Sequence, residues 1–133
     1  MNIGNLVIRI GIALLFVWGG LEKFFEGFLG GVGLQNMANF LKGSGLAFLG
    51  DTGTYALGAL LAALELIAGI LVFVNKQLLF AYAFLAFIML LALVLVHIPS
   101  GNWMNIMIHI MLITTLAGLA INENENSKIK LYL

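Results

Sequence analysis

Long, uninterrupted runs of apolar residues dominate this chain. Crossing about 30 Å of hydrocarbon at about 1.5 Å per helical residue takes roughly 20 residues. Four stretches of about that length are almost wholly apolar: Ile3–Leu21, Thr54–Val74, Leu78–Val96 and Trp103–Ile121. Their apolarity is continuous and does not alternate, so they predict helices and not the strands of a membrane barrel. The expected fold is all-α, an integral membrane four-helix bundle.

Polar residues between these stretches indicate how they are connected. Asn75-Lys76-Gln77 predicts a tight hinge, and Pro99-Ser100-Gly101-Asn102 predicts a second turn. The first connection is long, from about residue 22 to 53, and contains apolar residues at helical spacing, which predicts a short interfacial helix. Those residues are Leu34, Met37, Ala38 and Leu41. We therefore expect one transmembrane domain over residues 1–121, followed by a polar tail over 122–133.

The composition supports lipid as the solvent and excludes several functions. Hydrophobic residues make up 62% of the chain and charged residues 9%, against about 45 to 50% and about 25% in soluble domains. Six basic residues balance six acidic ones, so no basic surface for nucleic acid is expected. The chain has no cysteine, so redox chemistry would require a bound cofactor.

The distribution of basic residues predicts an orientation, because short cytoplasmic loops are enriched in lysine and arginine. One side receives Arg9, Lys76, Lys128 and Lys130, and the other receives Lys23 and Lys42. Both termini of this multi-pass protein of the cell membrane are therefore expected in the cytoplasm. The first stretch is expected to be retained and not cleaved as a signal peptide, because Arg9 interrupts its apolar region.

Two charged residues lie inside the predicted spans, where a charge costs about 2.5 to 3.5 kcal/mol on insertion scales. Counted from the outer ends of their spans, Arg9 lies about 20 Å deep and Glu65 about 16 Å deep. These similar depths predict that the two side chains meet, either directly or across a small polar ligand. The alternative is a purely architectural pair that sets helix register.

Further polar residues are expected in the outer half of the bundle. Lys23 lies near the helical stripe of Arg9, Asn105 and His109 lie one turn apart in the fourth span, and His97 ends the third. With Glu22, these side chains would line a vestibule, and Trp18 and Trp103 would mark its outer boundary. Glu65 and His109 are the candidates for moving a proton, and Arg9, Lys23, His97 and Asn105 are the candidates for binding a ligand or cofactor.

The alternative for the histidines is a structural role. No metal site is expected. His97 is typical of a residue at a loop end, whereas an imidazole at position 109 in mid-span needs a partner. A depth difference of about 9 Å between His97 and His109 argues against a shared haem iron.

The polar pattern resembles that of the DoxX family of small four-helix membrane proteins. The resemblance is carried by Arg9-Ile10-Gly11 in the first span, by Gly19-Gly20-Leu21-Glu22-Lys23 at its end, and by Glu65 followed by Leu66-Ile67-Ala68-Gly69-Ile70-Leu71. It implies association with oxidoreductases, including the membrane subunit of a thiosulfate to quinone oxidoreductase. The family positions matched are Arg9, Lys23 and Glu65. The missing cysteine argues against a thiol-based mechanism.

Three functions follow as hypotheses. The first is a quinone-associated oxidoreductase component that binds a small polar or anionic ligand in an outer-facing cavity, with its own enzymatic activity left open. The second is a small proton- or ion-coupled transporter or channel, and the third is a non-catalytic scaffold for an oxidoreductase partner. Gly11, Gly19 and Gly58 would allow helix contacts in a homo-oligomer.

Overall fold

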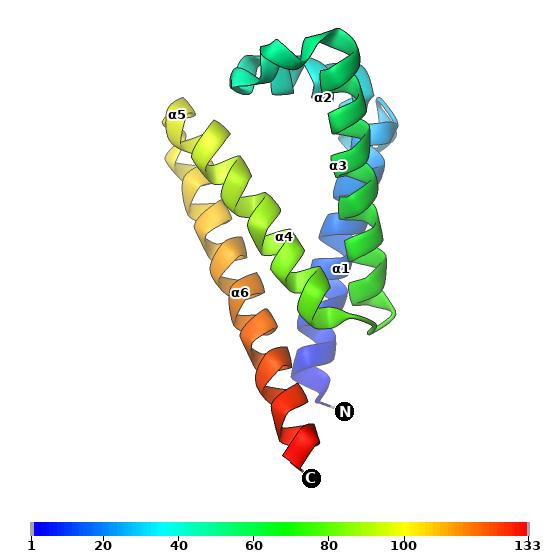
Figure 1. Cartoon of the computed structure of the whole chain (residues 1–133), viewed down its shortest axis with the longest axis vertical. Coiled ribbons are helices and arrows are strands. Elements are labelled where there is room, and N and C mark those ends of the chain that lie inside the picture. The colour runs from blue at the N-terminus through cyan, green and yellow to red at the C-terminus, as the bar shows by residue number, and fades with distance from the viewer. Residues whose placement is uncertain (1, 133) are drawn as a thin grey trace. The chain divides into compact units, whose positions relative to one another are not determined.

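The chain is helical throughout the part that the structure describes (Figure 1). This computed structural model describes residues 2–132, and the side chains of residues 2–126. Four helical segments are long and apolar enough to cross a membrane, and no strand occurs among the described residues. The predicted all-α membrane fold is therefore confirmed, and a four-helix bundle fits it. By its internal contacts the chain divides into two compact units, residues 1–74 and 75–133.

The first unit contains two long helices and a structured connection between them. Its elements are α1 (Ile3–Phe24), the 3-10 turn η1 (Phe28–Gly30), α2 (Gly33–Leu41), the π-helical η2 (Lys42–Leu46), the 3-10 turn η3 (Ala47–Leu49) and α3 (Gly50–Phe73). The Asn2 side chain begins α1 by accepting hydrogen bonds from the backbone of Gly4 and Asn5, which satisfies two of the unpaired donors at the helix start.

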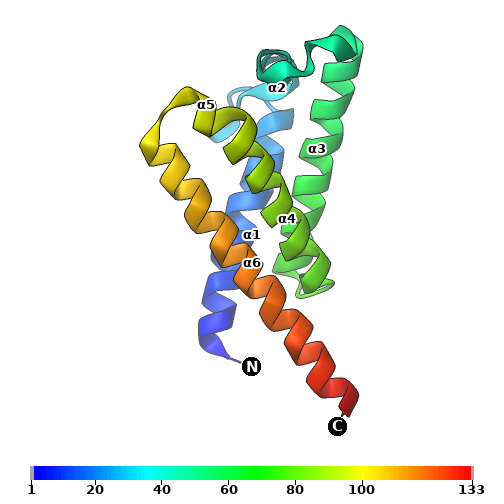
Figure 2. The ribbon, with the colours of Figure 1, turned by 60° about the vertical axis from the view of Figure 1, so that its left-hand side comes forward.

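Glycines bring α1 and α3 into backbone contact, and Figures 1 and 2 both show the two helices side by side. A Cβ atom added to Gly20 would lie 2.9 Å from the Cα atom of Leu66, and one added to Gly69 would lie 2.9 Å from the backbone nitrogen of Val17. Position 20 thus faces 66 while 17 faces 69, so the helices are antiparallel. Small residues are needed at such close crossings of membrane helices.

The short helix predicted in the first connection is confirmed as α2. It packs on α3 at Gly58, where an added Cβ would lie 3.1 Å from the Cγ atom of Met37 and 3.6 Å from Cδ1 of Leu41. Ala38 is only 1% exposed on the same face. Gly58 therefore serves packing within the chain, whereas a Cβ on Gly11 would meet nothing within 4 Å.

The second unit is a helical hairpin. It consists of α4 (Leu78–Ala92), the π-helical η4 (Leu93–His97), the short α5 (Ile98–Ser100) and α6 (Trp103–Tyr132), and α4 packs against α6. Gly101, with a φ of 70°, makes the left-handed turn that ends α5. The helix α6 continues into the predicted tail as far as Tyr132. The side chains of Lys128 and Lys130, used in the orientation argument, lie outside the described residues.

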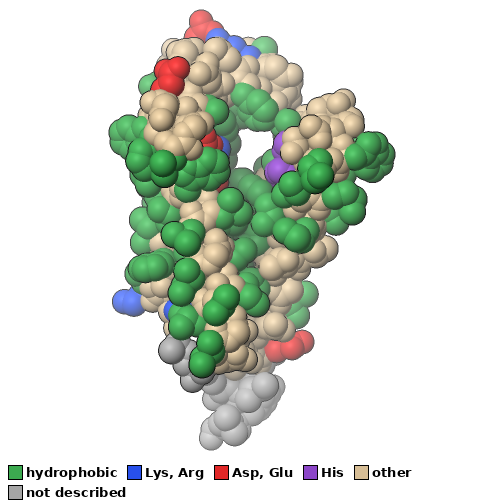
Figure 3. Space-filling model, turned by 180° about the vertical axis from the view of Figure 1, so that it is seen from behind, with side chains coloured by type: hydrophobic (Ala, Val, Ile, Leu, Met, Phe, Trp, Pro, Cys, Tyr) green, Lys and Arg blue, Asp and Glu red, His purple; other side chains and the backbone are tan. Residues whose placement is uncertain are grey.

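The surface seen in Figure 3 carries mostly hydrophobic side chains, with sparse charged ones toward its ends. Large apolar side chains such as Leu14, Phe80 and Met107 are more than half exposed. Soluble monomers rarely expose so much contiguous apolar surface. In a multi-pass membrane protein, lipid covers these side chains.

The predicted orientation can be tested by labelling, since the native chain has no cysteine. Ile3 and Phe48 are 74% and 80% exposed and lie at opposite ends of the first unit. With cytoplasmic termini, Phe48→Cys reacts with a membrane-impermeant maleimide in intact cells, whereas Ile3→Cys reacts only after permeabilisation. The reverse labelling pattern would contradict the orientation.

Candidate functional site

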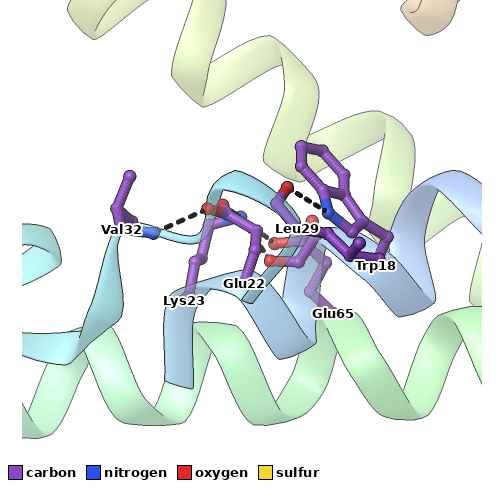
Figure 4. Close-up of polar contacts among 7 residues, drawn as sticks. Trp18, Glu22, Lys23, Leu29, Val32 and Glu65 are labelled. Carbon is purple, nitrogen blue, oxygen red and sulfur yellow. Dashed lines mark hydrogen bonds and ion pairs between the residues drawn. The ribbon is translucent and has the colours of Figure 1, made fainter. Parts of the chain in front are cut away.

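Lys23, in the last turn of α1, is the centre of a cluster of ionisable side chains (Figure 4). Its Nζ atom lies 2.9 Å from the carbonyl oxygen of Gly19, 3.1 Å from Oε2 of Glu65 and 3.4 Å from Oε1 of Glu22. The first contact is a hydrogen bond and the other two are ion pairs. We call Glu22, Lys23 and Glu65 the Lys23 cluster.

Glu65 is the most buried member of the cluster. It projects from the middle of α3, and its side chain is 6% exposed, against 20% for Lys23 and 13% for Glu22. Gly19 makes this placement possible, because a Cβ atom there would lie only 2.5 Å from Oε1 of Glu65. The glycine therefore provides both a carbonyl acceptor for the lysine and space for the carboxylate.

The cluster holds more negative than positive charge. With both carboxylates ionised, two negative groups share one ammonium, which leaves a net charge of minus one. Removing such charge from water is costly unless it is paired, and one further proton or monovalent cation would neutralise the excess. Lys23 already faces two carboxylates, and its predicted role in binding a ligand stays a prediction.

Two hydrogen bonds hold the loop after α1, one to Glu22 of the Lys23 cluster and one to Trp18 of α1. The backbone N–H of Val32 donates to Oε2 of Glu22 at 3.2 Å, and the indole Nε1 of Trp18 donates to the carbonyl of Leu29 at 3.3 Å. Leu29 has a φ of 46°, in the left-handed region that leucine rarely adopts. These bonds hold the loop beside the cluster, as Figure 4 shows.

The predicted meeting of Arg9 with Glu65 is wrong. Glu65 lies beside Gly19, and Arg9 is ten residues before that glycine, which is about 15 Å along the helix axis. The depth estimate assumed that both spans reach the outer surface at the same level. Instead, the α1–α3 contacts put Phe24 level with about residue 61, so α3 extends roughly 16 Å past the end of α1. The half-buried Arg9 has an Nε atom without a hydrogen-bond partner among the described residues.

The two histidines form a second cluster, in the second unit. Their ring centroids are 4.0 Å apart with the planes tilted by 36°, so the predicted 9 Å separation in depth is wrong. The reason is that α5 continues the helical path for three residues beyond His97, which places this histidine about one turn inside the end of the span. A haem would have to lie between its two axial imidazoles, and rings this close leave no room for it.

Apart from Arg9, the structure thus places the predicted site residues in two groups, one in each unit. Asn105 contributes its backbone carbonyl, which lies 2.8 Å from Nδ1 of His109. Trp18 lies beside the Lys23 cluster, whereas Trp103 is 72% exposed. Gly19 was not recognised as a site residue, although its spacing of four residues from Lys23 is that of a helical carbonyl partner. Nothing in the sequence pointed to the backbone of Val32.

Comparisons with known proteins give one match. A family model described as DoxX matches residues 4–98, from α1 to the start of α5, which confirms the resemblance inferred from the sequence. The matched part includes the whole Lys23 cluster and His97, while His109 lies beyond it. No curated protein and no solved structure matches the chain.

Proposed function

The chain belongs to the DoxX family, and we propose that it is a quinone-associated membrane component of an oxidoreductase, in which the Lys23 cluster exchanges a proton with the quinone headgroup. The observation that carries this proposal is the sharing of one ammonium by two carboxylates, of which Glu65 is 5% exposed in a membrane-spanning helix. Ionisable groups at such positions are rare and are generally functional.

The charge of the cluster suits proton exchange. Reduction of a quinone to a quinol takes up two electrons and two protons, and oxidation releases them. The oxidoreductase partner would supply or accept the two electrons, the Lys23 cluster would exchange one proton, and water would exchange the other. One proton added to the Lys23 cluster changes its net charge from minus one to zero, so both states avoid an excess of positive charge in a poorly solvated site. A general acid or base must also lie within hydrogen-bond reach of the reacting oxygen.

The position of the cluster suits a ligand with a polar head and an apolar tail. Lys23 is in the last turn of α1, next to the loop held by Val32 and Leu29. A quinone headgroup would reach the carboxylates from this end of the helix pair, and its isoprenoid tail would lie along the exposed apolar surface of the helices. Association with quinone-linked oxidoreductases, which the family resemblance implies, agrees with this substrate class.

Quinone binding can be measured with Trp18 as the reporter, because the chain has only two tryptophans. In a Trp103→Phe background reconstituted in liposomes, a short-chain ubiquinone is expected to quench Trp18 fluorescence with saturation. Glu65→Gln keeps the side-chain volume but removes the charge, and we expect it to weaken the saturable quenching about tenfold, which corresponds to about 1.4 kcal/mol. Purified protein should also carry quinone in its lipid extract.

Matched glycine variants separate binding from partition into lipid. Gly19→Ala would push the Glu65 carboxylate aside, and Gly11→Ala on the same helix meets nothing within 4 Å. The first is expected to weaken saturable quenching, and the second to leave it unchanged. A Trp18→Phe protein, which reports from Trp103, gives the partition background. Linear quenching in every variant, with no co-purifying quinone, would overturn the proposal.

Proton-coupled transport is the second candidate, because an excess of carboxylate over ammonium also binds and releases protons or cations during transport. The decisive measurement is flux into liposomes loaded with a pH-sensitive dye. Protein-dependent proton flux that Glu65→Gln abolishes, without any saturable quinone quenching, would favour transport over the quinone-linked function.

A further inference from the structure

The histidine pair in the second unit lies outside the Lys23 cluster and has its own chemistry. The Nδ1 atom of His109 lies 2.8 Å from the carbonyl oxygen of Asn105. A carbonyl can only accept a hydrogen bond, so Nδ1 carries the proton and Nε2 of the neutral ring keeps a free lone pair. Donation of the other ring N–H to a carbonyl is the usual way in which proteins orient a metal-binding histidine.

His97 adds a second imidazole next to the first. It ends the π-helical segment η4, and π-helical turns inside helices frequently occur at functional sites. Within the described part of the chain its ring makes no hydrogen bond, and its closest aromatic neighbour is His109, at a centroid distance of 4.0 Å. Both side chains are partly exposed, and histidine side chains reach the surface drawn in Figure 3. His97 lies about one turn inside the end of its span, where Gly101 ends α5, so a ligand would reach the pair from this end of the hairpin.

The surroundings of the pair offer no opposite charge. No Asp, Glu, Lys or Arg occurs between Lys76 and Glu123, and Glu123 is fourteen residues, or about 21 Å along the helix axis, from His109. Each neutral imidazole has one ring nitrogen with a lone pair. A ligand that binds both rings through these nitrogens must accept electron pairs. Among such ligands, borderline divalent transition metals have the strongest preference for imidazole nitrogen.

We propose that His97 and His109 form a binding site for a divalent transition metal ion, such as Cu²⁺ or Zn²⁺, at the α5 end of the second unit. With metal–nitrogen distances of about 2.0 to 2.1 Å, two imidazoles in adjacent coordination positions have ring centroids about 4.5 to 5 Å apart. Small side-chain rotations would widen the observed centroid distance of 4.0 Å to this spacing.

The site would keep open coordination positions. In the described part of the chain no third His, Cys, Asp or Glu joins the pair to complete a metal centre. Water or an external ligand would therefore occupy the remaining positions, as in metal sites that interact with a substrate. This inference is independent of the proposed quinone function and adds a site that the sequence did not predict.

Copper binding provides the test, because these are the only two histidines in the chain. Full-length protein purified through a histidine-free tag is titrated with Cu²⁺ in detergent, and electron paramagnetic resonance counts the bound nitrogens. We expect one ion per chain with two imidazole nitrogens. His97→Asn and His109→Asn should each lower the affinity at least tenfold, and the double variant should remove the signal. Mg²⁺, which prefers oxygen ligands, should not compete.

A measurement on the unmodified chain guards against variants that fail to fold. Bound Zn²⁺ should protect both histidines from modification by diethyl pyrocarbonate, and Mg²⁺ should not. The proposal is overturned if the native protein binds Cu²⁺ no more tightly than the double variant, if only one imidazole is coordinated, or if Zn²⁺ gives no protection. In those outcomes the rings are a stacked pair that binds at most a proton.

Discussion

Replacing Lys23 with methionine is expected to lower the free energy of unfolding by about 3 kcal/mol, the lower end of the range for breaking a buried ion pair. Methionine preserves much of the apolar stem but removes the ammonium between Glu65 and Glu22. The Glu65 carboxylate, whose side chain is 6% exposed, would then lie next to a second carboxylate without a compensating charge. Reversible unfolding in mixed detergent micelles measures the change.

Lys42 provides the matched control for this substitution. It pairs with Asp51, but the side chain of Asp51 is 92% exposed, and exposed ion pairs contribute at most about 1 kcal/mol. Lys42→Met should therefore have a small effect. A double variant with Lys23→Met and Glu65→Leu should recover much of the lost stability, because it leaves no buried charge at position 65. Equal effects of Lys23→Met and Lys42→Met would contradict the buried pair.

Gly20→Ala is expected to cost about 2 kcal/mol through overpacking. An added Cβ atom would lie 2.9 Å from the Cα atom of Leu66 and 3.0 Å from the carbonyl oxygen of Ala62. These are backbone atoms, so the clash cannot be relieved by a change of rotamer and the two helices must separate. The same unfolding measurement applies.

Gly11→Ala is the control, because it lies on the same helix and an alanine Cβ there meets nothing within 4 Å. It should leave stability unchanged or raise it slightly, since alanine is the better helix former. If both alanine variants behave alike, the close α1–α3 crossing at Gly20 is absent in the membrane.

The membrane spans were predictable because the length of an apolar run can be read from the local sequence alone. The short helix α2 was predictable for the same reason, from the spacing of Met37, Ala38 and Leu41. Gly19 and Gly58 were expected to allow close helix contacts, although between subunits, whereas both make close contacts within the chain. The partner is set by the register between two helices far apart in the chain, which hydropathy does not encode.

The error at Arg9 shows this limit. Residues 50–60 of α3 extend past the end of α1. In this part of α3, Gly58 contacts α2. Depths counted from the ends of the two spans therefore had different origins. The correct partner, Lys23, lies about four turns along the helix from Arg9 on nearly the same face. Helical periodicity alone therefore cannot tell which of the two basic residues contacts Glu65.

The histidine pair was missed for a related reason. The segment Pro99-Ser100-Gly101-Asn102 was interpreted as a turn, with His97 at the end of the preceding span. Proline is tolerated in the first turn of a helix, and here it lies within α5, so the turn begins only at Gly101. The shift of about one turn brings the ring of His97 next to that of His109.

The most direct test of the central claim, that Lys23 and not Arg9 is the partner of the buried Glu65, is a double-mutant cycle on the free energy of unfolding. The cycle combines Glu65→Gln with Lys23→Met, and a parallel cycle combines it with Arg9→Met. The structure predicts a coupling energy of at least about 1 kcal/mol between positions 23 and 65, and additivity within about 0.5 kcal/mol between positions 9 and 65. Strong coupling of Glu65 to Arg9, with none to Lys23, would contradict the account.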